Sequence, residues 1–296
     1  MNRLPAACAL ALAVAACLAG PAAAQTTAPA AMSQDAKTSN PFFAPSPLEY
    51  NFPQFDKIKD ADFAPAFDRG MAEQTAEIAK IADNPEAPTF DNTILAMERS
   101  GQVLSRAAYV FFNLTSANTD DELNKLEADY SPKFAAQHDS IYLNDKLFAR
   151  IKALYEKRAD LGLDPQALRL VEKYYEDFVH SGANLTPAQK DRVKQINAEI
   201  ATLQTTLTQN VLAEANADAV IVDSRDQLAG LSDEQIQGLA DDAKAKGLDG
   251  KYRIALVNTT GQPLEAQLEN RALRERIYKA SVNRGSHGGQ WDNTAP

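Results

Sequence analysis

Residues 187–215 read PAQKDRVKQINAEIATLQTTLTQNVLAEA, and this stretch decides the fold class. Thr186 precedes it as a helix cap, and Pro187 takes a first-turn position, where the missing proline N–H costs no hydrogen bond. We expect a long helix packed antiparallel on its neighbours, with self-association as the alternative, because apolar residues recur close to every 3.5 positions. This apolar row consists of Val193, Ile196, Ile200, Leu203, Leu207 and Val211.

Helical patterns continue on the amino-terminal side of this stretch. Apolar residues recur at steps of three or four positions, which is typical of helices with one buried face. One of these segments is apolar almost all round near residues 109–112, so we expect it at the centre of the fold. The predicted helices span residues 60–82, 94–114, 119–138, 144–158 and 166–179.

The pattern on the carboxy-terminal side of this stretch is no longer purely helical. Residues 219–223 and 252–258 are rich in β-branched side chains and predict two short strands, with a helix at 232–246 between them. A last helix at 264–282 carries a basic cluster that we interpret as a solvated face with salt bridges. Together the patterns predict a mainly α fold, an elongated multi-helix body with a small αβ element near residues 219–258. The basic residues are Arg271, Arg274, Arg276 and Lys279.

Residues 40–53, NPFFAPSPLEYNFP, combine four prolines with closely spaced aromatic side chains. Proline excludes a helix here, and so dense a set of aromatics favours burial. We therefore expect an extended strap laid on the body of the protein, with a proline-rich ligand for a partner as the alternative. Residues 25–39 are small and polar without periodicity, which predicts a disordered leader.

Residues 1–24 are typical of a secretory signal peptide. Arg3 precedes an apolar run at residues 6–19, and Ala-Ala-Ala at 22–24 fits a cleavage site before Gln25. The run is too short to span a bilayer, and no later stretch reaches the length of a membrane helix. Alternatively, the small residues before Cys17 match a bacterial lipoprotein signal, which would leave a lipid anchor on Cys17. Both interpretations predict an exported, periplasmic protein.

Charge and cysteine content exclude some classes of partner and site. The formal net charge is −10 and the isoelectric point about 4.9, so an acidic surface repels nucleic-acid phosphates, and no nucleic-acid partner is expected. Cys8 and Cys17 are the only cysteines, and both lie in the signal segment. The rest of the chain therefore has no thiol for a disulfide or a metal.

No catalytic constellation is indicated. The sequence contains no H-E-x-x-H motif, no G-x-S-x-G turn and no glycine-rich phosphate loop. Glu176 lies four residues before one histidine at a helix end, which we interpret as a surface pair. Residues 60–62 lack the glycine and the final glutamate of a calcium loop. We therefore predict no catalytic, cofactor-binding or metal-binding residue in this chain. The histidines are His138, His180 and His287.

Particular strings do resemble a known family. They include NPFF at residues 40–43, FDKIKDADFAPAF at 55–67 and PTFDNTILAMERSG at 88–101. These are similar to the amino-terminal part of the thimet oligopeptidase family of zinc metallopeptidases, and most resemble its bacterial peptidyl-dipeptidase branch, Dcp. The resemblance continues at residues 131–133, 144–150, 161–163, 170–178, 258–260 and 270–275.

The resemblance implies a considerably longer, mostly helical enzyme that removes dipeptides from the carboxyl ends of short peptides. It implies zinc held by an H-E-x-x-H motif and a further glutamate in the carboxy-terminal half, with the motif glutamate activating water. This chain contains no such motif. Residues 40–296 are accordingly expected to be the helical amino-terminal region of such a fold, a truncated half without bound zinc and inactive alone.

Residues 283–296, NRGSHGGQWDNTAP, are interpreted in the same way as an inter-helix loop of a longer enzyme. Two other interpretations stay open. One is a free-standing, non-catalytic exported helical protein that binds peptides or a subunit. The other is a half that complements a separately encoded half.

Overall fold

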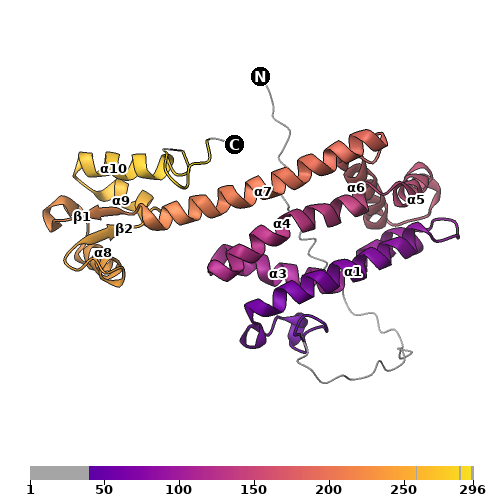
Figure 1. The fold of residues 1–296 in the computed structure, drawn as a ribbon, viewed down its shortest axis with the longest axis horizontal. Coiled ribbons are helices and arrows are strands. Elements are labelled where there is room, and N and C mark those ends of the chain that lie inside the picture. Colours follow the sequence, from indigo (N-terminus) through magenta and orange to yellow (C-terminus); the bar gives the residue numbers. More distant parts are fainter. Residues whose placement is uncertain (1–39, 258, 287, 295–296) are drawn as a thin grey trace. The chain divides into compact units, whose positions relative to one another are not determined.

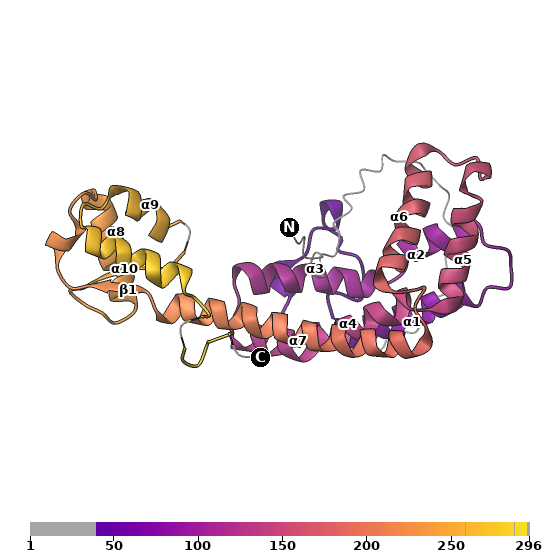
Figure 2. The same ribbon diagram turned by 90° about the horizontal axis from the view of Figure 1, so that it is seen from above.

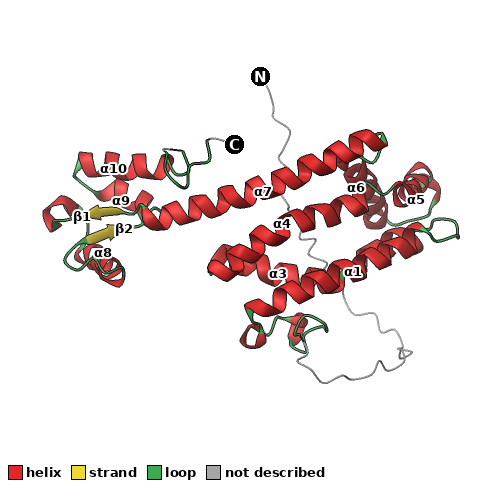
Figure 3. Ribbon diagram, in the orientation of Figure 1, coloured by secondary structure: helices red, strands yellow, loops and turns green. Residues whose placement is uncertain are grey.

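The computed structural model describes residues 40–257, 259–286 and 288–294. The signal segment, the leader, Cys17 and His287 lie outside these residues. The described residues are mainly α-helical with one small sheet (Figure 1, Figure 3), which confirms the predicted fold class. In the described part of the chain, no helix combines the length and the apolar character that crossing a membrane requires. The main elements are α1 Phe63–Ala82, α2 Ala96–Glu98, α3 Gln102–Ala117, α4 Asp121–Tyr142, α5 Asp145–Glu156, α6 Pro165–Ser181, α7 Pro187–Ala217, β1 Val220–Val222, α8 Asp233–Ala245, β2 Tyr252–Ile254, α9 Gly261–Gln267 and α10 Arg271–Val282.

Side-chain caps begin several helices where the sequence predicted a start. The Thr186 side chain accepts from the Gln189 backbone N–H, and the Gln189 side chain accepts from the Thr186 N–H, so α7 opens with a capping box. Ser232 and Gln235 form the same arrangement at α8. These reciprocal bonds satisfy donors that a helix start otherwise leaves without partners.

Two predicted helices are interrupted. The helix expected at 94–114 breaks before α3, where Gly101 has a φ of 70° that favours glycine. A π-helical turn, η4 (Phe90–Leu95), and α2 precede this break. The helix expected at 264–282 divides into α9 and α10, because Asn270 leaves the helix and accepts from the Leu273 N–H to cap a new one.

The predicted αβ element is present. β1 and β2 pair antiparallel, with Val220 opposite Ile254. Side chains from both strands and from α8, α9 and α10 form one apolar cluster. Two basic residues of α10 bond to backbone: Arg274 donates to the Leu268 carbonyl and Arg276 to the Ile221 carbonyl. Lys279 forms a salt bridge with Glu275.

An aromatic cluster joins α1, α3 and α4. Phe67 lies at its centre, with ring centroids 5.2 Å from Phe111 and 4.9 Å from Phe134 in edge-to-face geometry. Phe63 and Tyr130 pack against the same ring. A further cluster lies among α5, α6, the end of α1 and η4, and includes the buried side chains Ile94, Leu147, Ile151 and Phe178.

A buried arginine closes the connection between α1 and η4. Arg150 of α5 donates to the carbonyls of Asn84 and Glu86, each at 2.9 Å, and to the side-chain oxygen of Asn92, also at 2.9 Å. These neutral acceptors disperse the guanidinium charge, and together they fix the loop that follows α1.

The expected strap is only half formed. Phe42 is buried against Phe63, and Arg106 of α3 donates to the Phe42 carbonyl. Further along, Tyr50 is 92% exposed and adopts a φ of 55°, an uncommon backbone conformation for a non-glycine residue. Burial of all these aromatics was therefore a wrong expectation, because no described element covers the second half. The exposed side chains, here called the aromatic tip, are Leu48, Tyr50, Phe52 and Phe55.

The crossing of α1 and α3 generates a prediction about two helical glycines. A Cβ on Gly70 would lie 2.6 Å from the Leu104 backbone nitrogen, whereas a Cβ on exposed Gly238 of α8 would meet nothing within 4 Å. Gly70→Ala should lower the free energy of unfolding by about 1–3 kcal/mol through overpacking. Gly238→Ala should raise it by about 0.5–1 kcal/mol through helix propensity. Urea denaturation of both variants measures this, and an equal effect of the two substitutions would contradict it.

Candidate functional site

The described residues contain no group of three or more His, Cys, Asp or Glu side chains placed to hold a metal ion. They therefore do not fit the zinc ion that the family resemblance implies. His138 instead stacks on Tyr142, with ring centroids 4.2 Å apart. Its Nδ1 lies 3.8 Å from the neighbouring Asp139 carboxylate.

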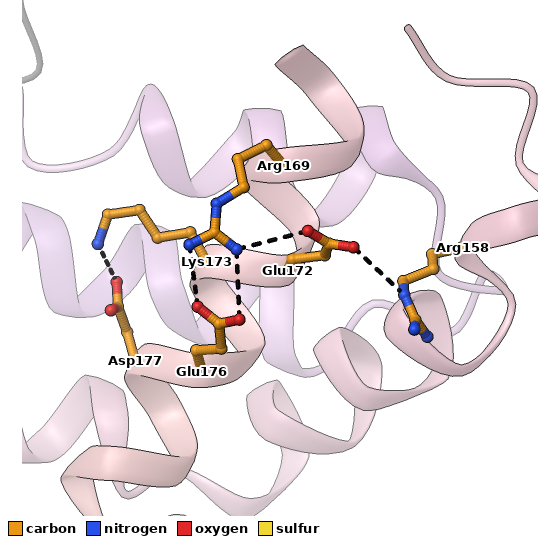
Figure 4. A network of polar contacts seen from close by, with 6 residues as sticks. All are labelled: Arg158, Arg169, Glu172, Lys173, Glu176 and Asp177. Carbon is orange, nitrogen blue, oxygen red and sulfur yellow. Dashed lines mark hydrogen bonds and ion pairs between the residues drawn. The ribbon is translucent and has the colours of Figure 1, made fainter. Parts of the chain in front are cut away.

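Glu176, the predicted surface partner of His180, belongs to an ion network on α6 (Figure 4), and the nearby His180 also acts on its carboxylate. The Arg169 guanidinium holds Glu176 with two nitrogens, at 3.2 Å and 3.1 Å, and this hydrogen bonding lowers the pKa of Glu176. Arg169 and Arg158 share Glu172. The network faces solvent, where such pairs contribute little stability.

Two tyrosines form a second polar cluster, between α6 and its neighbours. The Tyr174 hydroxyl donates to the Glu98 carboxylate at 2.6 Å and so links α6 to α2. Burial raises the pKa of Tyr142 to about 12, and the carboxylates of Asp177 and Glu98 add to this effect. Burial also raises the pKa of Tyr174, assisted by the bond to Glu98. Both phenols stay protonated at neutral pH, so they bond as neutral groups and do not serve as bases.

The contact between α4 and α7 is polar. The two helices run antiparallel side by side (Figure 1, Figure 2), as expected for α7. Their contact is made by hydrogen bonds between side chains, or from a side chain to a backbone carbonyl. These join Lys190 to Leu143 at 3.2 Å, Asn197 to Asp139 at 2.7 Å, Thr205 to Ser131 at 2.7 Å and Gln209 to Asn124 at 2.7 Å.

The apolar row of α7 therefore points away from α4. Ile196 is 37% exposed, Ile200 36%, Leu203 48% and Leu207 51%. Lys190 and Glu214 are the buried residues of α7 in the described part of the chain, and neither is apolar. The helix thus packs on α4 as expected, but through its polar face and not through this row. These four exposed residues are the α7 apolar row from here on.

The sequence did contain the signal for the buried side of α7. Asn197, Thr205 and Gln209 are separated by multiples of four residues, so they share one helix face together with Lys190. Four polar side chains on one face of a long helix indicate a polar contact with a neighbouring element. The apolar repeat drew attention to the other face.

Gly285 and Asn293, near the end of the described residues, lie against the same face of α7 as the apolar row. The Gly285 N–H donates to the buried Glu214 carboxylate, and Asn210 donates to the Asn293 side chain at 2.8 Å. Asn210 and Glu214 follow Leu207 by three and seven residues, which places them on its face of the helix. Residues 283–286 and 288–294 therefore lie at the carboxy-terminal end of this face.

The arrangement is a helical region without a described metal site and with one uncovered apolar helix face. No protein-family model matches the chain. Over 258 residues the chain is 44% identical to the dipeptidyl carboxypeptidase of Escherichia coli K12, which covers 87% of this chain and 38% of that protein. It is 28% identical over 253 residues to oligopeptidase A of Haemophilus influenzae, covering 82% and 36% respectively.

A plant relative, the organellar oligopeptidase A of Arabidopsis thaliana, is 23% identical over 270 residues, which is 89% of this chain and 33% of that protein. The chain therefore spans less than two fifths of the length of these curated relatives. By homology the chain belongs to the thimet oligopeptidase family, which confirms the resemblance drawn from residues 40–43, 55–67 and 88–101.

The tyrosine cluster generates a prediction about alkaline pH. The unfolded chain releases the Tyr142 proton near pH 10 and the folded chain only near pH 12. The contribution to stability is thus complete below about pH 10 and is lost as the pH rises through about 12. Tyr142→Phe should make the urea midpoint fall less steeply across this interval. The midpoint is measured against pH, and equal slopes for both proteins would contradict the assignment.

Proposed function

We propose that this chain provides the amino-terminal helical region of an exported zinc peptidase that hydrolyses short peptides. The observation that carries the proposal is the 44% identity to a dipeptidyl carboxypeptidase over 87% of this chain, combined with coverage of only 38% of that protein. By analogy with that relative's name, the reaction is the release of dipeptides from peptide carboxyl ends. The chain alone is proposed to be inactive.

The chemistry of the described residues supports a helical region that is separate from the zinc-binding part of the enzyme. Metal-assisted hydrolysis needs a cluster of ligands and a base, and no such cluster lies among the described residues. Their polar groups are instead used to hold helices together, as Arg150 and Asp139 illustrate. The proposed role of the region is that of a scaffold beside the part of the enzyme that holds the zinc.

A second candidate function is a non-catalytic exported protein that binds a peptide or a subunit. The α7 apolar row favours it, because clustered apolar side chains on a surface mark interaction sites. The two candidate functions predict different results when the chain is joined to the remainder of a peptidase. Only the first predicts an active enzyme.

A chimeric enzyme tests the proposed function. Residues 40–294 of this chain replace the matched 258 residues in the Escherichia coli dipeptidyl carboxypeptidase. The chimera should release dipeptides from a blocked peptide in a zinc-dependent manner, whereas the relative lacking the matched region should not. An inactive chimera would contradict the scaffold role.

The full chain by itself is tested in the same assay, together with metal analysis. We expect no dipeptide release and less than one zinc ion per chain after dialysis. Zinc-dependent turnover by the chain alone would show that ligands exist which the proposal does not foresee.

Export is tested by the mass of the mature protein in its native type of host. We propose secretion through residues 1–24, with a mature chain that starts either at Gln25 or at a lipid-modified Cys17. Cys17→Ala should leave the first product unchanged and abolish the second. A cytoplasmic protein that retains residues 1–24 would rule out export.

A further inference from the structure

We propose that the α7 apolar row is the docking surface for an amphipathic helix belonging to the part of a family enzyme that this chain does not contain. The inference rests on the proposed function and adds to it a specific surface and the chemistry of its partner. The inference is based on how α7 is oriented. Its polar face lies against α4, and its apolar face is exposed to solvent.

The geometry of the row fits a helical partner. Ile196, Ile200, Leu203 and Leu207 follow one another at steps of four, three and four residues, so they form one continuous ridge. The ridge is roughly 16 Å long, from a rise of about 1.5 Å per residue. Such a ridge interdigitates with the apolar ridge of a second helix at a shallow crossing angle.

The composition beside the row defines the chemistry of the partner. Between Ile196 and Leu207, Glu199 is the only charged residue, and the remaining positions are Ala, Asn, Gln and Thr. A surface so poor in charge gives no ion pairs to a polar partner or an anionic ligand. It suits a partner helix with an apolar stripe and uncharged flanks, whose burial removes apolar area from water.

Two observations identify the source of this partner. The match covers 38% of the dipeptidyl carboxypeptidase, so 100 − 38 = 62% of that protein has no counterpart in this chain. In addition, residues near the carboxy-terminal end of the described chain already lie on the row's face of α7, through Gly285 with Glu214 and Asn293 with Asn210. Polypeptide that continues beyond this segment in a longer enzyme therefore begins next to the row.

A second copy of this chain fits the row less well. The apolar repeat of residues 193–211 covers fewer than three heptads, whereas a coiled coil between copies calls for a repeat sustained over three to four. The copies would also have to approach over the segment 283–294, which occupies one end of the face. Self-association is therefore an outcome of the test and not the inference.

Thiol accessibility tests the proposal. Leu203→Cys places a thiol in the row, and Thr202→Cys is the matched control, since Thr202 is exposed and lies about 100° around the helix. Both variants are made in the full chain and in the chimera. Reaction with a maleimide is followed by peptide mapping, which separates these sites from other cysteines.

In the full chain we expect both cysteines to react at similar rates. In the chimera, Cys at position 203 should react at least ten-fold more slowly than in the full chain, while the control at position 202 keeps its rate. Equal rates at position 203 in the two proteins would overturn the inference. Protection already present in the full chain, increasing with concentration, would overturn it in favour of a second copy.

The peptidase assay on the chimera keeps this inference separate from the proposed function. An active chimera with an accessible position 203 would contradict the docking inference and support the proposed function. An inactive chimera with a protected position 203 would support the docking inference and contradict the proposed function. An inactive chimera with an accessible position 203 overturns both.

A second pair of variants covers the case in which a cysteine disturbs folding. Leu203→Gln combined with Leu207→Gln should leave the melting temperature of the full chain unchanged, because both side chains are exposed there. The same substitutions should lower the melting temperature of the chimera by several degrees. Equal shifts in the two proteins would mean that nothing covers the row.

Discussion

The hydrogen bond from Asn197 of α7 to Asp139 of α4 constrains how α7 is oriented on the helices beside it. Asp139 is only 4% exposed, and a buried carboxylate is costly unless it is bonded. α7 must therefore turn its polar side toward α4. The same rotation aligns Thr205 with Ser131 and Gln209 with the Asn124 carbonyl, and it leaves the α7 apolar row on the outer side.

This constraint separates the two faces of α4. One face carries Tyr130 and Phe134 into the aromatic cluster with α1 and α3, where burial of apolar area supplies the stability. The other face carries Ser131 and Asp139 to α7, where directional bonds fix register and rotation. α7 thus adds length and orientation to the fold and contributes no buried apolar side chain to the described clusters.

Much of this fold is predictable from local sequence, because caps and periodicity act over a few residues. Thr186, Ser232 and the β-branched strands gave the positions of α7, α8 and the sheet correctly. Gly101 and Asn270 were missed as helix breaks, since a single residue of either type is also tolerated within a helix. The rotation of α7 could not be predicted, because periodicity identifies an apolar face and does not say which element covers it. The expected burial of the aromatic tip was wrong for the same reason, because the sequence does not say which element would cover it. The family could be inferred from short stretches such as residues 40–43 and 55–67, and the sequence shows directly that it contains no H-E-x-x-H motif.

The polar character of the α4–α7 contact has a thermodynamic consequence. Exposure of apolar surface raises the heat capacity, whereas exposure of polar surface lowers it. Release of α7 from α4 uncovers the amide, hydroxyl and carboxylate groups of these bonds, which lowers the heat-capacity change of this step. The aromatic cluster behaves oppositely and weakens on cooling. Low temperature consequently loosens the phenylalanine core while the contact that orients the longest helix persists.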